Sequence, residues 1–125
     1  MRSALGKGRG RNRAALNTVN TVMAAPMPAA NVRIAATVNE VQVWDLVNLS
    51  EMSHPFHLHG FFFQVLSRDG VAVASPTWED TLELHGEERV RIAFRPDDRP
   101  GMWMFHCHIL EHAHGGMMGM LELTR

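Results

Sequence analysis

The sequence predicts an all-β domain, either an antiparallel sandwich or a small barrel of about eight short strands. One observation is that apolar residues recur with a period of two from residue 32 onward, which is typical of strands with a buried face. Another is that short clusters of glycine, proline and aspartate separate the apolar runs at close intervals, as turns do. The length of 125 residues fits one such domain.

The predicted strands follow one another from residue 41 to residue 123. The first, Val41 to Asn48, is apolar at most positions and is therefore expected to be buried on both faces. Further strands are expected over residues 61–66, 71–74, 81–84, 90–94, 102–106 and 118–123. The breakers between them are residues 68–70, 75–76, 85–86 and 97–101. Only residues 109–114 could form a turn of helix, which the two following glycines would end.

The first 31 residues are expected to form a poorly ordered lead-in, so that the folded domain covers residues 32–125. Residues 1–39 carry six basic and no acidic side chains, whereas the remainder carries six basic and thirteen acidic ones. The basic side chains near the start favour a nucleic-acid-binding arm only weakly, and we expect no nucleic-acid partner. Polar residues interrupt the apolar stretch at 14–25, so we expect no secretion signal there. No apolar run approaches the roughly 18 residues that a membrane span needs.

The chain has one cysteine and eight histidines. Cys107 cannot form an internal disulfide, so its thiol is available for metal or redox chemistry. Eight histidines are a high count for 125 residues, and most of them fall in two short windows. Clustering of histidines around a cysteine points to a metal site.

Strand geometry divides the histidines between two faces. Alternate side chains of a strand point in opposite directions, so His106 and His108 share one face while Cys107 points to the other. One tripeptide can therefore serve two sites. The same parity places His57 and His59 on one face.

His54 precedes this second pair and is separated from it by Pro55, so its side chain is free to turn elsewhere. His112 and Met117 follow Cys107 at steps of five residues. A thiolate, two imidazoles and a thioether form the ligand set of a blue copper site. Zinc fits less well, because zinc has no preference for a thioether. The residues that would supply the blue copper site are His54, Cys107, His112 and Met117.

Two His-x-His pairs remain, and all-nitrogen ligation suits a second copper centre. A single pair of this kind is commonly just surface. Two pairs that flank a cysteine, together with a suitably placed histidine and methionine, are much less expected by chance. The residues of the second centre would be His57, His59, His106 and His108.

Two segments resemble the signatures of the last cupredoxin domain of multicopper oxidases, a family that includes laccases, bilirubin oxidases and copper-efflux oxidases. One is HPFHLHG at residues 54–60, and the other is HCHILEH at residues 106–112, followed by Gly116 and Met117. The resemblance extends through Trp78 to Thr81 and covers most of residues 32–125. It implies a cupredoxin-like Greek-key β-barrel and a copper-dependent oxidoreductase.

The resemblance also implies a role for each ligand. His54, Cys107, His112 and Met117 resemble the type 1 copper ligands. His57 resembles a type 2 ligand, and His59, His106 and His108 resemble type 3 ligands of a trinuclear cluster. Electrons in this family enter through the histidine that matches His112 and pass along the cysteine to the neighbouring histidines. The expected catalytic residues are therefore His112, Cys107, His106 and His108. Members of the family usually work in the periplasm or outside the cell, which implies a periplasmic or secreted location.

The chain differs from the family in the number of histidines available for a trinuclear cluster. The family's trinuclear cluster takes half of its eight histidines from the first cupredoxin domain and half from the last, and this chain has only the latter half. His85 and His114 stand alone and are expected at the surface. An oxidase would therefore need another cupredoxin domain or a second copy of the chain.

Apolar residues near the ligands bear on such a partner. Met102 and Met104 share the strand face of His106, and residues 61–63 form a run of three phenylalanines after His59. These side chains suit burial against a partner, but they equally suit the barrel's own core.

Our leading hypothesis is a laccase-like domain that takes electrons from a phenolic, aromatic amine or low-valent metal donor and, with a second copper-binding face, reduces dioxygen to water. One alternative is a single-domain blue copper electron-transfer protein. Another is an inactive copper-binding fragment. The four retained histidines of the trinuclear type favour the oxidase, whereas the short chain favours the alternatives.

Overall fold

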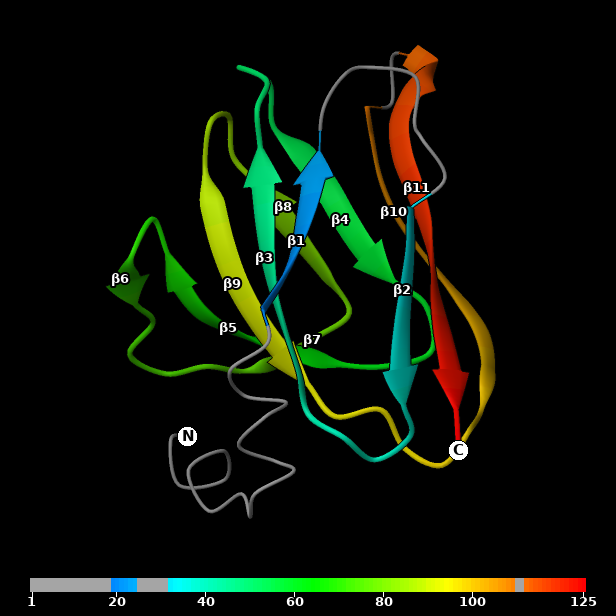
Figure 1. Ribbon diagram of the computed structural model, residues 1–125. Helices are drawn as coiled ribbons and strands as arrows, with labels where there is room; N and C mark the ends of the chain where they lie inside the picture. The colour runs from blue at the N-terminus through cyan, green and yellow to red at the C-terminus, as the bar shows by residue number, and fades with distance from the viewer. Residues whose placement is uncertain (1–18, 25–31, 110–111) are drawn as a thin grey trace.

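The computed structural model describes residues 19–24, 32–109 and 112–125. Within these ranges the chain forms eleven strands and no helix, so the predicted all-β class is confirmed. The strands lie in two sheets (Figure 1). It follows that no helix in these ranges is long and apolar enough to cross a membrane.

The first sheet has the strand order β1-β3-β9-β5-β6, and β7 pairs with β5 outside this path. Its strands are β1 (Val19–Ala24), β3 (Gln42–Asn48), β9 (Arg89–Phe94), β5 (Phe63–Arg68), β6 (Val71–Ala72) and β7 (Trp78–Glu79). The predicted strands at 61–66, 90–94 and 41–48 correspond to β5, β9 and β3.

The second sheet has the order β2-β11-β10-β4-β8. Its strands are β2 (Val32–Thr37), β11 (His112–Thr124), β10 (Gly101–Ile109), β4 (His54–Leu58) and β8 (Thr81–Leu84). His54 and His57 on β4 thus lie in the same sheet as residues 106–108 on β10, and β4 and β10 are direct neighbours.

A core rich in aromatic side chains fills the space between the sheets. Trp44 of β3 is fully buried and meets Phe94 and Phe105 edge-on, with ring centroids 5.0 and 4.9 Å apart. Phe105 belongs to the second sheet, so this cluster joins both layers. Edge-to-face pairs of this kind contribute about 0.5–1.5 kcal/mol beyond the burial of their area. The core therefore anchors β10 immediately before His106.

The start of the domain differs from the prediction. The sequence predicts a poorly ordered lead-in that includes residues 19–24, but these residues form β1, which pairs in parallel with β3. Val22 lies opposite Leu46 and is only 2% exposed. Neighbouring polar residues hide this buried position from a search for apolar periodicity. The rest of the lead-in lies outside the described residues, so its boundary stays a prediction.

Two ladders are parallel, whereas the sequence predicts an antiparallel sandwich or small barrel. β1 pairs in parallel with β3, and β2 pairs in parallel with β11. β1 and β2 are consecutive in the chain but belong to different sheets, so they do not pair with each other. The remaining ladders are antiparallel.

The predicted helical turn at residues 109–114 is wrong for the residues described. β10 and β11 form a long antiparallel ladder that runs from Gly101 opposite Leu123 to Ile109 opposite His112. Residues 110–111 lie outside the described part of the chain. The ladder extends to the last described residue on each side, so strand pairing overrides the local tendency of this segment to form a helix.

Candidate metal centre

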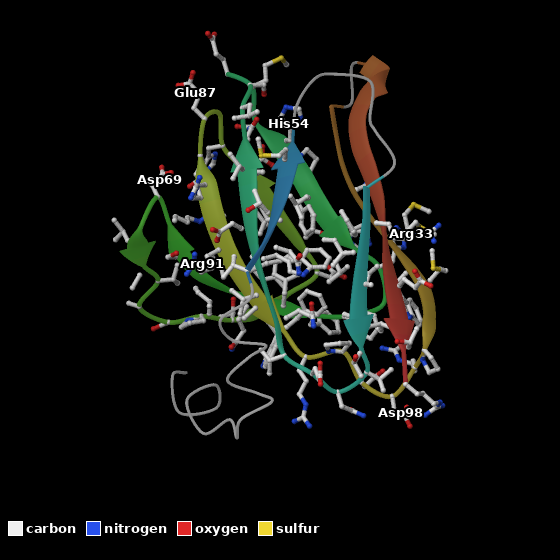
Figure 2. All side chains as sticks on the ribbon, viewed as in Figure 1. Arg33, His54, Asp69, Glu87, Arg91 and Asp98 are labelled. Carbon is white, nitrogen blue, oxygen red and sulfur yellow. The ribbon has the colours of Figure 1, made fainter. Side chains whose placement is uncertain are left out.

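β4 presents its side chains alternately to the core and away from it. His54, Phe56 and Leu58 are buried, with exposures of 1%, 1% and 0%. Pro55 and His57 are half-buried on the other face. Figure 2 shows His54 near the end of the molecule where β1 and β3 also finish. The strand thus separates His54 from His57, as the sequence parity predicts.

Three histidine rings gather on the outer face of the second sheet. His57 and His59 have ring centroids 4.5 Å apart, and His106 lies 5.5 Å from His57 and 5.3 Å from His59. Strand pairing produces the cluster, because His57 is the register partner of His106 between β4 and β10. The backbone N–H of His59 donates to the carbonyl of Met104 at 3.0 Å, which extends the contact beyond β4.

Hydrogen bonding defines which nitrogen of His57 can bind a metal. Its Nδ1 lies 2.8 Å from the backbone oxygen of Asp80 and 2.9 Å from Oγ1 of Thr81. A carbonyl oxygen can only accept, so Nδ1 carries the hydrogen and Nε2 of the neutral ring keeps its lone pair. Metal-binding histidines commonly donate their other N–H in this way. Sequence reasoning did not assign a role to Asp80, although the segment 78–81 belongs to the family resemblance.

Burial affects the ionisation of His54. Loss of hydration lowers the pKa of His54 below its ordinary value, while the negative charge of Glu83 acts in the opposite direction. The neutral ring is therefore favoured, and the neutral ring is the form that binds metal ions. Its Nε2 lies 2.7 Å from Oγ of Ser50, a residue that sequence reasoning missed.

Arg99 packs on the rings of Phe61 and Trp103 and so holds the turn that follows His59; we call this group the Arg99 clip. Gly60 has φ +89°, and a Cβ atom there would lie 2.5 Å from Cε3 of Trp103. The guanidinium of Arg99 lies 4.6 Å from the centroid of the Phe61 ring and 4.9 Å from that of Trp103. Arg99 also donates to the carbonyl of Gly60 at 2.6 Å. The clip fixes the backbone beside His59 and depends on a glycine at position 60.

The other predicted ligands are placed only by their backbone. Cys107 and His108 lie on β10, and His112 and Met117 lie on β11. Cys107 is the register partner of Met117 on one side and of Phe56 on the other. The side chains of these four residues are outside the described part of the structure, so their place in a metal site stays a prediction. The side chain of His114 is also outside the described part of the structure, whereas His85 is exposed, as predicted.

The apolar residues beside the histidines divide between core and surface. Phe61 and Phe63 are buried, at 6% and 0% exposure, and so cover the domain's own core. Phe62 and Met102 are 62% and 42% exposed. The interpretation that these residues cover the domain's own core is confirmed for Phe61 and Phe63, whereas burial of Phe62 and Met102 against a partner stays a prediction.

The donor chemistry of the cluster fits copper. Three imidazoles lie together, and imidazole nitrogen is a good ligand for copper. His57 already has its second nitrogen hydrogen-bonded, as a ligand requires. Among the side chains described, however, no group of three or more His, Cys, Asp or Glu residues is arranged to hold a metal ion. The three described histidines therefore do not by themselves form a metal site.

Comparison with known proteins identifies the family. A family model described as multicopper oxidase matches residues 7–124. The chain is 38% identical over 96 residues to the multicopper oxidase mco of Staphylococcus aureus, and 33% identical over 107 residues to a laccase of Bacillus subtilis. Each match covers 70% of this chain and 21% of the relative. The chain belongs to the multicopper oxidase family, and it spans about a fifth of the length of the curated relatives it matches.

Solved structures agree with this assignment. A laccase of Pediococcus acidilactici superposes with a TM-score of 0.75 at 31% identity, over 86% of this chain and 27% of that protein. A Campylobacter jejuni multicopper oxidase, described as a metallo-oxidase, gives a TM-score of 0.67 at 33% identity, over 76% of this chain and 21% of that one. The predicted cupredoxin-like fold is thereby confirmed, and membership of the family implies copper as the cofactor.

Proposed function

We propose that this chain is the copper-binding last cupredoxin domain of a laccase-like multicopper oxidase. In this role it takes electrons singly from a donor and, with a second copper-binding face, reduces dioxygen to water. The observation that carries the proposal is the cluster of His57, His59 and His106 on a multicopper oxidase domain. A domain that only carried electrons through one blue copper would have no use for this cluster.

The proposed ligands form two sets. Type 1 copper is held by His54, Cys107, His112 and Met117, and the type 2 and type 3 positions are held by His57, His59, His106 and His108. Bound copper would supply one-electron redox chemistry at the first set and dioxygen reduction at the second.

The protein's own residues position these ligands. The Asp80 carbonyl holds the ring of His57, and the Arg99 clip holds the turn after His59. Cys107 lies between His106 and His108 in the chain, so a few covalent bonds join the two ligand sets. The backbone of β10 therefore provides a short route for electrons from the first set to the second.

The cluster needs a partner, which we propose to be either another cupredoxin domain or a second copy of this chain. Phe62 and Met102 support a partner face, because both are exposed and both are close in sequence to cluster histidines. The electron donor proposed is a phenol, an aromatic amine or a low-valent metal ion. The proposed location is periplasmic or extracellular.

Copper-loaded protein, separated by size, tests the proposal. We expect an associated species to bind more copper per chain than the monomer does and to consume dioxygen when a phenolic donor is added. If every species binds a single copper ion, shows blue colour and consumes no dioxygen, the alternative of a blue copper electron-transfer protein replaces the oxidase. Copper binding without colour or turnover would instead indicate an inactive copper-binding fragment.

A further inference from the structure

The hydrogen-bond partners of Asn48, at the end of β3, determine which way its side-chain amide faces. Its amide is buried, at 1% exposure. Nδ2 lies 2.8 Å from the carbonyl oxygen of Met52, 3.1 Å from that of Leu84 and 2.9 Å from that of His85. Carbonyl oxygens only accept, so the atom that faces them must be the NH₂ group. The amide oxygen Oδ1 must therefore face the opposite way.

Oδ1 of Asn48 determines what Ser50 does with its hydroxyl hydrogen. The backbone N–H of Ser50 donates to Oδ1 at 2.9 Å, and the hydroxyl oxygen of Ser50 lies 2.8 Å from the same atom. The carbonyl of Met52, at 3.1 Å, is a second acceptor for that hydroxyl. A serine hydroxyl has one hydrogen. If this hydrogen pointed away from Oδ1 of Asn48, the oxygen atoms Oγ of Ser50 and Oδ1 of Asn48 would lie 2.8 Å apart with no hydrogen between them, which is unfavourable.

Two further groups contact this hydroxyl oxygen: the backbone N–H of Met52, which donates to it at 3.3 Å, and the ring of His54. Its Nε2 lies 2.7 Å from Oγ of Ser50. Because the serine hydrogen is directed to an oxygen, Nε2 must be the donor in this contact, and the neutral ring then carries its lone pair on Nδ1. We propose that Asn48 and Ser50 are positioning residues that hold His54 as the Nε2–H tautomer, so that Nδ1 is the atom offered to copper. The inference rests on the proposed function, in which His54 is a copper ligand.

His57 provides an internal contrast. It is on the same strand, but its Nδ1 donates to the carbonyl of Asp80, so it is held as the other tautomer. Two histidines three residues apart thus present different ring atoms, each selected by a neighbour outside β4. Partners of this kind orient metal ligands and increase their basicity.

Nitrogen NMR of the metal-free protein tests the inference directly. Long-range correlation of ring protons with ring nitrogens, above the ordinary histidine pKa of about 6.5, separates the two neutral tautomers. We expect Nε2 of His54 to have the shift of a protonated nitrogen and Nδ1 that of an unprotonated one, with the opposite pattern for His57. In Ser50→Ala, both His54 shifts should move toward a tautomer mixture while those of His57 stay unchanged.

Two further variants separate positioning from general structure. Ser50→Thr keeps the hydroxyl and should restore the wild-type shifts of His54. Ser53→Ala removes an exposed serine next to His54 and should change neither histidine. A wild-type His54 with its proton on Nδ1 would overturn the inference, and so would wild-type shifts in Ser50→Ala. The measurement on the wild type decides the question even if Ser50→Ala does not fold.

Copper titration provides the second readout and keeps this inference distinct from the proposed function. With copper(II) added to the full chain, Ser50→Ala should bind at the blue site about 10-fold or more weakly than the wild type, the usual effect of removing a ligand's hydrogen-bond partner. Equal affinity would contradict a positioning role. If the wild type bound no copper at all, the proposed function would fail, whereas the tautomer of His54 would stand or fall on the NMR result.

Discussion

Cys107 is the residue on which the two proposed ligand sets meet. We predict that Cys107→Ser abolishes the intense visible absorption of the copper-loaded protein, because a hydroxyl does not replace a thiolate in a blue copper site. Absorption spectroscopy after copper loading checks this. A variant that keeps the intense colour would contradict the type 1 assignment.

His108→Ala is the matched variant for this test, since His108 is the next residue on β10. The sequence predicts, by strand parity, that its side chain lies on the opposite face from that of Cys107. The blue absorption should therefore remain, while dioxygen reduction by the assembled protein is lost. Loss of both properties together would show that the division by parity is wrong.

Gly60 is a second position at which one residue decides local structure. We predict that Gly60→Ala lowers the free energy of unfolding by about 2–4 kcal/mol, because the new methyl meets Trp103 and because the positive φ is strained for alanine. Gly70→Ala is the matched control. Its φ of +83° is similar, but nothing lies within 4 Å of the new Cβ, so the loss should be about 1 kcal/mol. Denaturant unfolding measures both, and equal losses would mean that the contact with Trp103 is unimportant.

At the scale of elements, the ordered turn between β4 and β5 depends on Arg99. We predict that Arg99→Met lowers the free energy of unfolding by about 1 kcal/mol, through loss of the stacking on Phe61 and Trp103 and of the bond to Gly60. Arg125→Met is the control, because Arg125 makes only an exposed ion pair with Asp98 among the contacts described. The control should change stability by less than about 0.5 kcal/mol. A larger loss in the control than in Arg99→Met would contradict the clip.

The strands that the sequence predicts well have an apolar pattern of their own, whether continuous, as in β3, or alternating, as in β8. β8 matches the prediction for 81–84, since Leu82 and Leu84 are buried between exposed neighbours. The turn at Asp69 and Gly70 was expected, and both residues have positive φ, as a two-residue hairpin requires. β1 escaped prediction because pairing with β3, a distant contact, stabilises it rather than its own pattern.

The same distinction applies to the candidate site. Strand parity was enough to predict that His57 and His59 share a face, because parity is local. The partner of the His57 ring could not be predicted, since it is a backbone carbonyl distant in the chain, and the amide of Asn48, which holds Ser50 beside His54, depends on another distant carbonyl. The Asp80 carbonyl reaches His57 across 23 residues, and the Leu84 carbonyl reaches Asn48 across 36.

For the molecule as a whole, the proposed oxidase function requires a partner surface beside the histidine cluster. We predict that Phe62→Lys weakens self-association of the copper-loaded chain and changes the free energy of unfolding by less than about 0.5 kcal/mol, since Phe62 is 62% exposed. Val71→Lys, at a position 70% exposed on β6, is the control and should not affect association. Sedimentation velocity distinguishes the two, and identical behaviour of both variants would exclude Phe62 from a contact between copies of the chain.

Copper bound per chain, measured together with visible absorption, decides whether the clustered histidines are copper ligands. The comparison is between the wild type, the double variant His57→Ala/His59→Ala and the control His85→Ala, whose histidine is exposed. The account predicts that the double variant loses copper but keeps its blue absorption, while the control matches the wild type in both. If the double variant binds as much copper as the wild type, the clustered histidines are not copper ligands and the account is wrong.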